Sequence, residues 1–106
     1  MVEVEWGMTM KMHNPAHPGE ILADYLEGGN ITISQLAARI RVARKTVSDI
    51  VNGKARVTVP MARRLARALG TTPGIWLRLQ VQRDEWELSQ MPEDDLHDIE
   101  PFEMAG

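Results

Sequence analysis

Apolar residues recur along this chain at spacings of three and four, the period at which an α-helix buries one face. The first such series runs from Ile21 to Leu26, follows Pro18-Gly19 and stops at Gly28-Gly29. Proline suits the first turn of a helix and glycine suits its end. A first helix is therefore predicted between these two signals.

The next helix is predicted to begin after Thr32. The Thr32 hydroxyl can cap its first turn, and Gln35, three residues on, can return a hydrogen bond to the Thr32 amide, as in a capping box. The apolar stripe that follows consists of Leu36, Ala37 and Ile40. This spacing predicts a short helix with one buried face.

Three more helices are predicted by the same reasoning. They cover residues 44–52 with Val47, Ile50 and Val51 inward, Pro60 to Gly70, and Thr72-Pro73 to about Ser89. No segment alternates between apolar and polar residues over a useful length, as a half-buried strand would. The predicted fold class is all-α, with five short helices.

Length and composition narrow the class of protein. The 106 residues suit one domain, and the lack of cysteine excludes a disulfide framework, cysteine-ligated zinc, an iron–sulfur cluster and a cysteine nucleophile. We see neither the apolar core of a signal peptide nor the roughly 20 apolar residues of a membrane-spanning helix. We therefore expect a cytoplasmic protein without a membrane partner.

Charge is distributed very unevenly along the chain. The formal charge of -3 at pH 7 would ordinarily argue against a nucleic-acid partner. Residues 34–83, however, carry eleven bases and one acid, a formal +10, whereas residues 84–106 carry nine acids and no base, a formal -9. The basic middle of the chain favours a nucleic-acid partner.

The segment from Gln35 to Lys54 looks like the DNA-binding helix-turn-helix of phage-repressor type. Its two helices are each about two turns long and are joined by a short connection. The small residue Ala37 lies where two crossed helices must approach closely, and Val42 and Val47 are apolar where the turn and the second helix must dock. The expected fold is a five-helix, phage-repressor-like bundle containing this motif.

Arg41 departs from the usual pattern, because glycine generally fills this position of the turn. A left-handed conformation there costs a residue with a Cβ about 1 kcal/mol. Two alternatives follow: Arg41 offsets the cost by reaching a phosphate, or the turn is reshaped.

The second helix of such a motif projects its N-terminal end outward, and the exposed residues there are the base-reading candidates. Arginine and lysine can donate to guanine, serine can serve several bases, and aspartate can accept from cytosine. The candidates are Arg44, Lys45, Ser48 and Asp49. Two alternatives remain open: Arg44 and Lys45 contact phosphates only, or Asp49 is a helix partner of one of them.

A second set of residues is expected to contact phosphates, because helix ends and loops bring their side chains and amides to the DNA backbone. These residues are Thr32, Gln35, Arg41, Thr46, Asn52, Lys54 and Arg56. Three arginines of the fourth helix are expected to be solvated or paired within the protein; they are Arg63, Arg64 and Arg67.

Residues from about Met12 to Gln90 resemble the HigA-type antitoxins, a branch of the phage-repressor-like regulators. The similar elements are His17-Pro18-Gly19-Glu20-Ile21-Leu22, Val51-Asn52-Gly53-Lys54, Pro60-Met61-Ala62-Arg63-Arg64-Leu65-Ala66 and Trp76-Leu77-Arg78-Leu79-Gln80. The resemblance implies a dimeric operator-binding repressor that also neutralises a cognate RNA-cleaving toxin of a HigBA-type pair. Its partners would be double-stranded DNA with an inverted repeat and a basic toxin protein.

The fifth helix carries two apolar stripes. Ile75, Trp76, Leu79 and Trp86 are expected in the core, whereas the opposite stripe needs a second surface to cover it. We expect that surface to be a homodimer interface formed by Leu77, Val81 and Leu88. The alternative is that the acidic tail folds back over this stripe.

The expected domain division has three parts: a flexible extension over residues 1–12, the DNA-binding domain with its dimerisation helix over 13–89, and an acidic tail over 90–106. No metal site is expected at His13 and His17, because Pro15 lies between them. All three histidines lie toward the two ends of the chain, and the chain has no glycine-rich phosphate loop, so we expect neither a cofactor nor enzymatic activity.

Two rival functions remain beside the antitoxin. The chain is either a stand-alone repressor without a toxin, or a protein-binding inhibitor with little DNA binding. The second rival draws on the acidic tail, which complements a basic protein partner.

Overall fold

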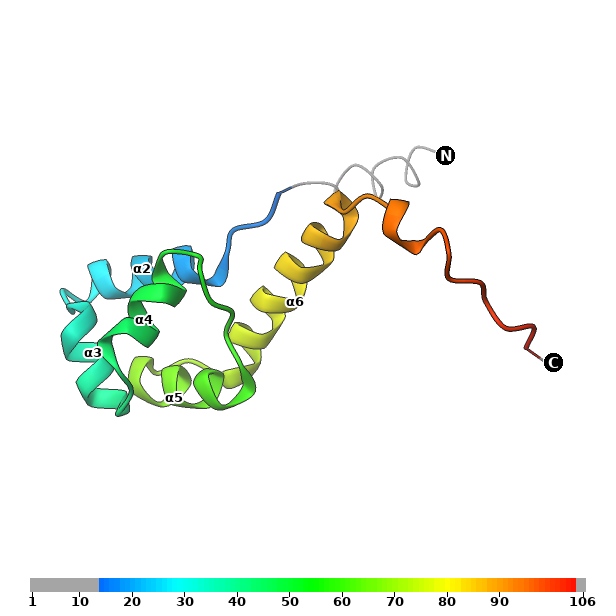
Figure 1. Cartoon of the computed structure of the whole chain (residues 1–106). Coiled ribbons are helices and arrows are strands. Elements are labelled where there is room, and N and C mark those ends of the chain that lie inside the picture. The colour runs from blue at the N-terminus through cyan, green and yellow to red at the C-terminus, as the bar shows by residue number, and fades with distance from the viewer. Residues whose placement is uncertain (1–13, 105–106) are drawn as a thin grey trace, which may run out of the picture.

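Five α-helices follow one another in the structure, a computed structural model that describes residues 14–104. They are α2 (Pro18–Gly28), α3 (Ile33–Ile40), α4 (Arg44–Val51), α5 (Val59–Leu69) and α6 (Pro73–Gln90), with a short 3-10 helix, Asp94–Leu96, after them. The described residues contain no strand, which confirms the all-α prediction (Figure 1). The extension predicted over residues 1–12 lies outside the described residues.

The predicted helix ends are confirmed at several positions. The Thr32 hydroxyl accepts a hydrogen bond from the Gln35 amide at 3.0 Å, and the Gln35 side chain accepts one from the Thr32 amide at 2.8 Å, so the capping box is present. Gly70 ends α5 in the left-handed conformation, with φ of 74°. Thr72, in contrast, makes no side-chain cap bond, and α6 begins with Pro73 alone.

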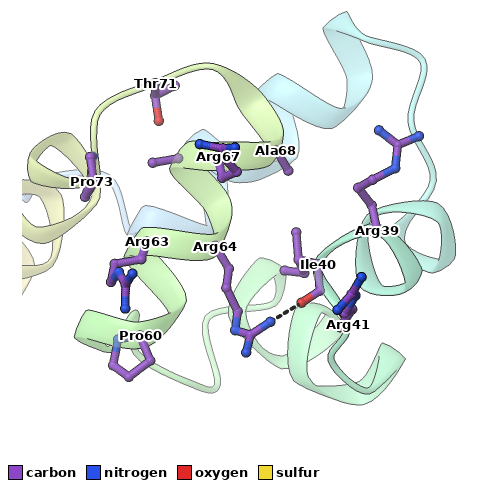
Figure 2. A pocket seen from close by; sticks show the side chains of 11 residues that line it. Arg39, Ile40, Arg41, Pro60, Arg63, Arg64, Arg67, Ala68, Thr71 and Pro73 are labelled. Carbon is purple, nitrogen blue, oxygen red and sulfur yellow. Dashed lines mark hydrogen bonds between the residues drawn. The ribbon is translucent and has the colours of Figure 1, made fainter.

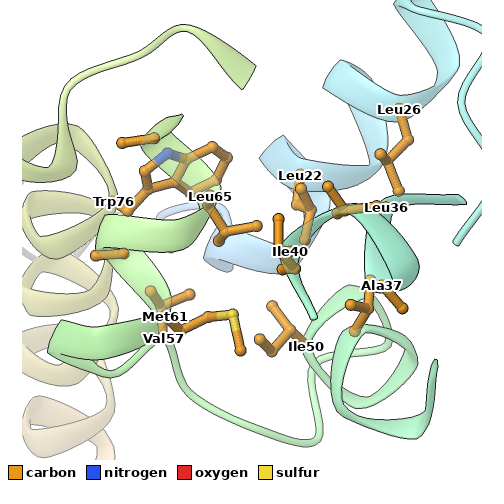
Figure 3. Close-up of a cluster of buried hydrophobic side chains, with 13 residues drawn as sticks. Leu22, Leu26, Leu36, Ala37, Ile40, Ile50, Val57, Met61, Leu65 and Trp76 are labelled. Atoms are coloured by element: carbon orange, nitrogen blue, oxygen red, sulfur yellow. The ribbon is translucent and has the colours of Figure 1, made fainter. Parts of the chain in front are cut away.

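One buried core joins all five helices (Figure 3). The inward stripes predicted for α3, α4 and α5 are buried there; they include Leu36, Ala37, Ile40, Val47, Ile50, Met61, Ala62, Leu65 and Ala66. Trp76 of α6 is fully buried, and its indole nitrogen donates to the Thr71 hydroxyl at 2.8 Å. The core therefore fixes α3 and α4 against the rest of the bundle.

Two residues of α6 differ from the prediction. Leu77 packs against the core instead of facing away from it. Trp86 lies outside the core, half-buried, with its ring centre 4.7 Å from the guanidinium carbon of Arg83. Among the described helices, α6 extends beyond the others in its second half (Figure 1), which leaves Trp86 outside the core.

The acidic tail continues away from the bundle after α6 (Figure 1). Its apolar side chains are exposed; they are Met91, Leu96, Ile99, Phe102 and Met104. Val81 and Leu88 of α6 are 52% and 68% exposed, so the described part of the tail does not cover them. The alternative in which the tail folds back over this stripe is therefore wrong.

His17 caps α2, because its Nδ1 accepts the Gly19 amide hydrogen at 2.8 Å. Burial, assisted by the positive charge of Arg83, lowers the pKa of His17 below its ordinary 6.5. Unfolded protein therefore binds this proton more tightly than folded protein does. The cap contributes its full stability above the ordinary pKa and loses it as the pH falls through the lowered one.

We expect His17→Asn to flatten the loss of stability below pH 6.5, because asparagine caps the helix without titrating. Thermal unfolding of both proteins across this pH range measures the effect. Equal slopes in the two proteins would contradict it.

No helix within residues 14–104 is long and apolar enough to cross a membrane.

Candidate nucleic-acid interface

Helices α3 and α4 form a helix-turn-helix. The two helices pack on each other through buried residues, with Leu36 and Ala37 on α3 and Val47 on α4. The amide of Val42, in the turn, donates to the carbonyl of Ala37 at 3.0 Å. This packing holds the N-terminal end of α4 outward, as the sequence predicts.

Arg41 adopts the left-handed conformation, with φ of 64° and ψ of 47°. Its amide donates back to the Ala38 carbonyl at 3.3 Å, and Arg64 of α5 donates to the Ile40 carbonyl at 2.6 Å (Figure 2). The C-terminal end of α3 is thus capped by an arginine from another helix. Because Arg41 keeps the left-handed conformation, the alternative in which the turn is reshaped is wrong.

Replacing Arg41 by glycine is expected to preserve the fold and to raise its stability by up to about 1 kcal/mol, because glycine adopts this conformation without a Cβ clash. If Arg41 contacts a phosphate, the same variant binds DNA more weakly at every sequence. Chemical denaturation and DNA titration measure the two effects. A marked loss of stability would show that the arginine side chain itself holds the turn.

The first turn of α4 presents Arg44 and Lys45 to solvent. The Arg44 Nε donates to the Ser34 hydroxyl of α3 at 3.0 Å, which orients its guanidinium. Lys45 lies 2.8 Å from the Asp49 carboxylate one turn later. The ion pair proposed as an alternative for Asp49 is therefore present in the DNA-free protein.

Ser48 is half-buried one turn into α4, and its hydroxyl accepts a hydrogen bond from the Asn52 side chain at 3.2 Å. Six of the seven phosphate candidates are exposed, whereas Thr46 is half-buried; the exposed ones are Thr32, Gln35, Arg41, Asn52, Lys54 and Arg56. Together with Arg44 and Lys45, these residues belong to one helix-turn-helix and its flanking loops.

Arg56 differs from the other phosphate candidates, because both of its terminal nitrogens donate to the Asp84 carboxylate, at 3.2 and 2.7 Å. This guanidinium holds the pKa of Asp84 below its ordinary value, against the opposing effect of burial. Gln80, which is 5% exposed, donates to Asp84 at 2.9 Å and accepts from the Val57 amide at 2.8 Å. Arg56 therefore ties the loop after α4 to α6 in the DNA-free protein.

Three supporting residues were not predicted from the sequence. Ser34 orients Arg44, Gln80 holds the loop after α4, and Arg64 caps α3. Only for Arg64 did the sequence give a partial indication, since an intramolecular role was expected for the arginines of this helix. The other two act through partners that lie 10 and 23 residues away in the chain.

Comparisons with known proteins agree with this geometry. A family model described as helix-turn-helix matches residues 22–76. Antitoxin HigA-1 of Vibrio cholerae is 36% identical over 96 residues, covering 90% of each chain. An uncharacterized helix-turn-helix transcriptional regulator of Haemophilus influenzae is 44% identical over 80 residues, covering 74% of this chain and 75% of the relative.

A solved structure gives the same result for the three-dimensional fold. The antitoxin HigA of Pseudomonas aeruginosa, solved with the higBA promoter, is similar with a TM-score of 0.73 and 34% identity. The similarity covers 82% of this chain and 97% of that one.

Proposed function

The chain belongs to the helix-turn-helix family, in the branch that contains the HigA antitoxins, and we propose that it is an operator-binding repressor that also acts as an antitoxin. In this role it represses its own operon and neutralises an RNA-cleaving toxin in the cytoplasm. The family is one of DNA-binding proteins and not of enzymes.

The observation that carries the proposal is the exposed first turn of α4. Arg44 and Lys45 stand free of the core there, while Val47 and Ile50 anchor the same helix in it. A rigidly held helix end with two long donors suits insertion into the major groove. Ser48 and Asp49 complete the proposed base-reading set. Asp49 must then release its ion pair with Lys45 and accept a hydrogen bond from a base.

The phosphate contacts proposed around α4 are Thr32, Gln35, Arg41, Thr46, Asn52, Lys54 and Arg56. Arg56 contributes only if DNA phosphates compete with the exposed Asp84 pair. Exposed ion pairs contribute little to stability, so a phosphate can replace this carboxylate at low cost.

Two copies are proposed to pair through α6. Val81 and Leu88 lie seven residues apart and are both exposed, so they form one stripe on the helix. Leu77, expected in this interface from the sequence, is half-buried against the core of its own chain. Only its exposed part can contact a second copy. Such a dimer would read an inverted repeat with half-sites one helical turn, or a multiple of it, apart.

Salt dependence of DNA binding tests the DNA part of the proposal. A protein that contacts several phosphates loses affinity steeply as salt rises, because counterions are released on binding. We expect this steep loss with DNA from upstream of the gene. Absence of binding at about 50 mM salt would favour the protein-binding inhibitor instead.

Co-expression with the product of the neighbouring reading frame tests the antitoxin part. We expect a small basic protein to be encoded there and to copurify with this chain. A neighbouring frame without such a protein would leave the stand-alone repressor as the better description.

A further inference from the structure

A concave surface of about 960 Å³ lies between α3, α5 and the loop before α6 (Figure 2). Among the described residues, five arginines and no acidic residue line it; the arginines are Arg39, Arg41, Arg63, Arg64 and Arg67. Apolar residues complete the lining, among them Ile40 and Pro73. We call this surface the arginine pocket.

The described part of the chain places no compensating negative charge in the arginine pocket. Arg64 donates to the Ile40 carbonyl, and within residues 14–104 none of the five arginines makes an ion pair. Like charges gathered in one concavity repel one another and attract an anionic ligand. The apolar lining and the volume suit a peptide that carries both acidic and apolar side chains better than a single small ion.

The acidic tail has this composition. Between residues 93 and 104 it carries six acids and no base, interleaved with four apolar residues; these are Leu96, Ile99, Phe102 and Met104. Their exposed fractions run from 53% to 87%, so the described structure leaves them uncovered. Charge and apolar pattern of the tail both complement the arginine pocket.

A chain cannot place most of this tail in its own pocket. The pocket lies at the first residue of α6, whereas the tail begins at the other end of this 18-residue helix, about 27 Å away. An extended tail covers about 3.3 Å per residue, so running back along the helix to its own pocket would use about eight residues, roughly 91–98. Of the six acids, only Glu100 and Glu103 would then reach the pocket.

An antiparallel α6 pair removes this difficulty. In a twofold pair centred between Val81 and Leu88, Met91 of one copy lies opposite residue 78 of the other. The remaining distance to the partner's Pro73 is about 8 Å of helix, which an extended tail covers in two or three residues. Acids from about Glu93 onward then reach the partner's pocket.

We propose that the arginine pocket of each copy binds the acidic tail of a second copy. This inference rests on the α6 dimer proposed above. Exchanged tails would close the dimer with two charge-complementary contacts in addition to the α6 stripe.

A spin label on the tail tests the exchange in the full chain. Because the sequence has no cysteine, Met104→Cys gives a single labelling site. Nitroxide-labelled protein is mixed with unlabelled, ¹⁵N-enriched native protein, so only contacts between copies broaden the amide signals. We expect the amides of Arg63, Arg67 and Thr71 to lose most of their intensity and to regain it when the nitroxide is reduced.

Variants of the ¹⁵N-enriched copy supply the control. Arg63→Gln combined with Arg67→Gln is expected to abolish the broadening, whereas Lys54→Gln, an exposed base outside both the pocket and α6, is expected to retain it. High salt should also restore the signals. Loss of broadening in both variants would overturn the pocket assignment.

Sedimentation of the same samples separates the two proposals. A dimer without broadening at the pocket overturns the tail exchange and leaves the dimer intact. Broadening seen only when label and ¹⁵N lie on one chain also overturns the exchange. A monomer overturns the α6 dimer, and the exchange with it.

Discussion

Gly19→Ala is expected to destabilise the domain by at least about 2 kcal/mol, or to lower Tm by about 10 °C. Gly19 is buried where α2 packs on α4, and a Cβ there would overlap the carbonyl oxygen of Ile50. Backbone cannot rotate out of the way as a side chain can, so the two helices must separate. Because α4 carries the base-reading candidates, DNA binding should weaken as well.

Gly28→Ala is the matched control, because it lies in the same helix and a Cβ there meets nothing within 4 Å. Alanine favours a helix over glycine by up to about 1 kcal/mol, so this variant should be as stable as the native protein or slightly more stable. Thermal unfolding compares the three proteins. Equal Tm values for the two variants would show that α2 and α4 are not in close contact at Gly19.

Arg44→Ala and Lys45→Ala are each expected to weaken operator binding by about 1–3 kcal/mol, which is roughly 5- to 150-fold. Both side chains are exposed, so neither change should alter Tm greatly. Competition titrations with operator and scrambled DNA measure the loss. Arg78→Ala, an exposed arginine on α6, is the control and should bind as the native protein does.

The scrambled DNA decides between the two roles left open for these residues. A base reader loses affinity for the operator and keeps its weak affinity for scrambled DNA, whereas a phosphate contact weakens both alike. Unchanged operator affinity in a variant that combines Arg44→Ala with Lys45→Ala would show that α4 does not contact the DNA.

Local signals explain why the helices could be predicted. The Thr32–Gln35 capping box and the left-handed Gly70 each involve residues within one turn, which the sequence displays directly. The inward stripe of α3 likewise follows from spacing alone. The left-handed conformation of Arg41 was one of the two alternatives that its position in the motif left open.

Contacts between distant segments explain what could not be predicted. The spacing of Leu77 and Trp86 gives the face each occupies on α6 but not the point where α6 leaves the bundle. The partners of Gln80 and Arg56 lie 23 and 28 residues away, and no local pattern pairs them. The Gly19 contact is similar, because nothing in the sequence shows that the Ile50 carbonyl faces it.

We propose that α4 reads a specific DNA sequence. The most direct test is a titration of the native protein with a duplex from upstream of its own coding sequence, against the same duplex with its inverted repeat scrambled, at about 150 mM salt. Specific recognition predicts binding to the intact duplex at least about 10³-fold tighter. Equal affinity for the two duplexes would contradict it.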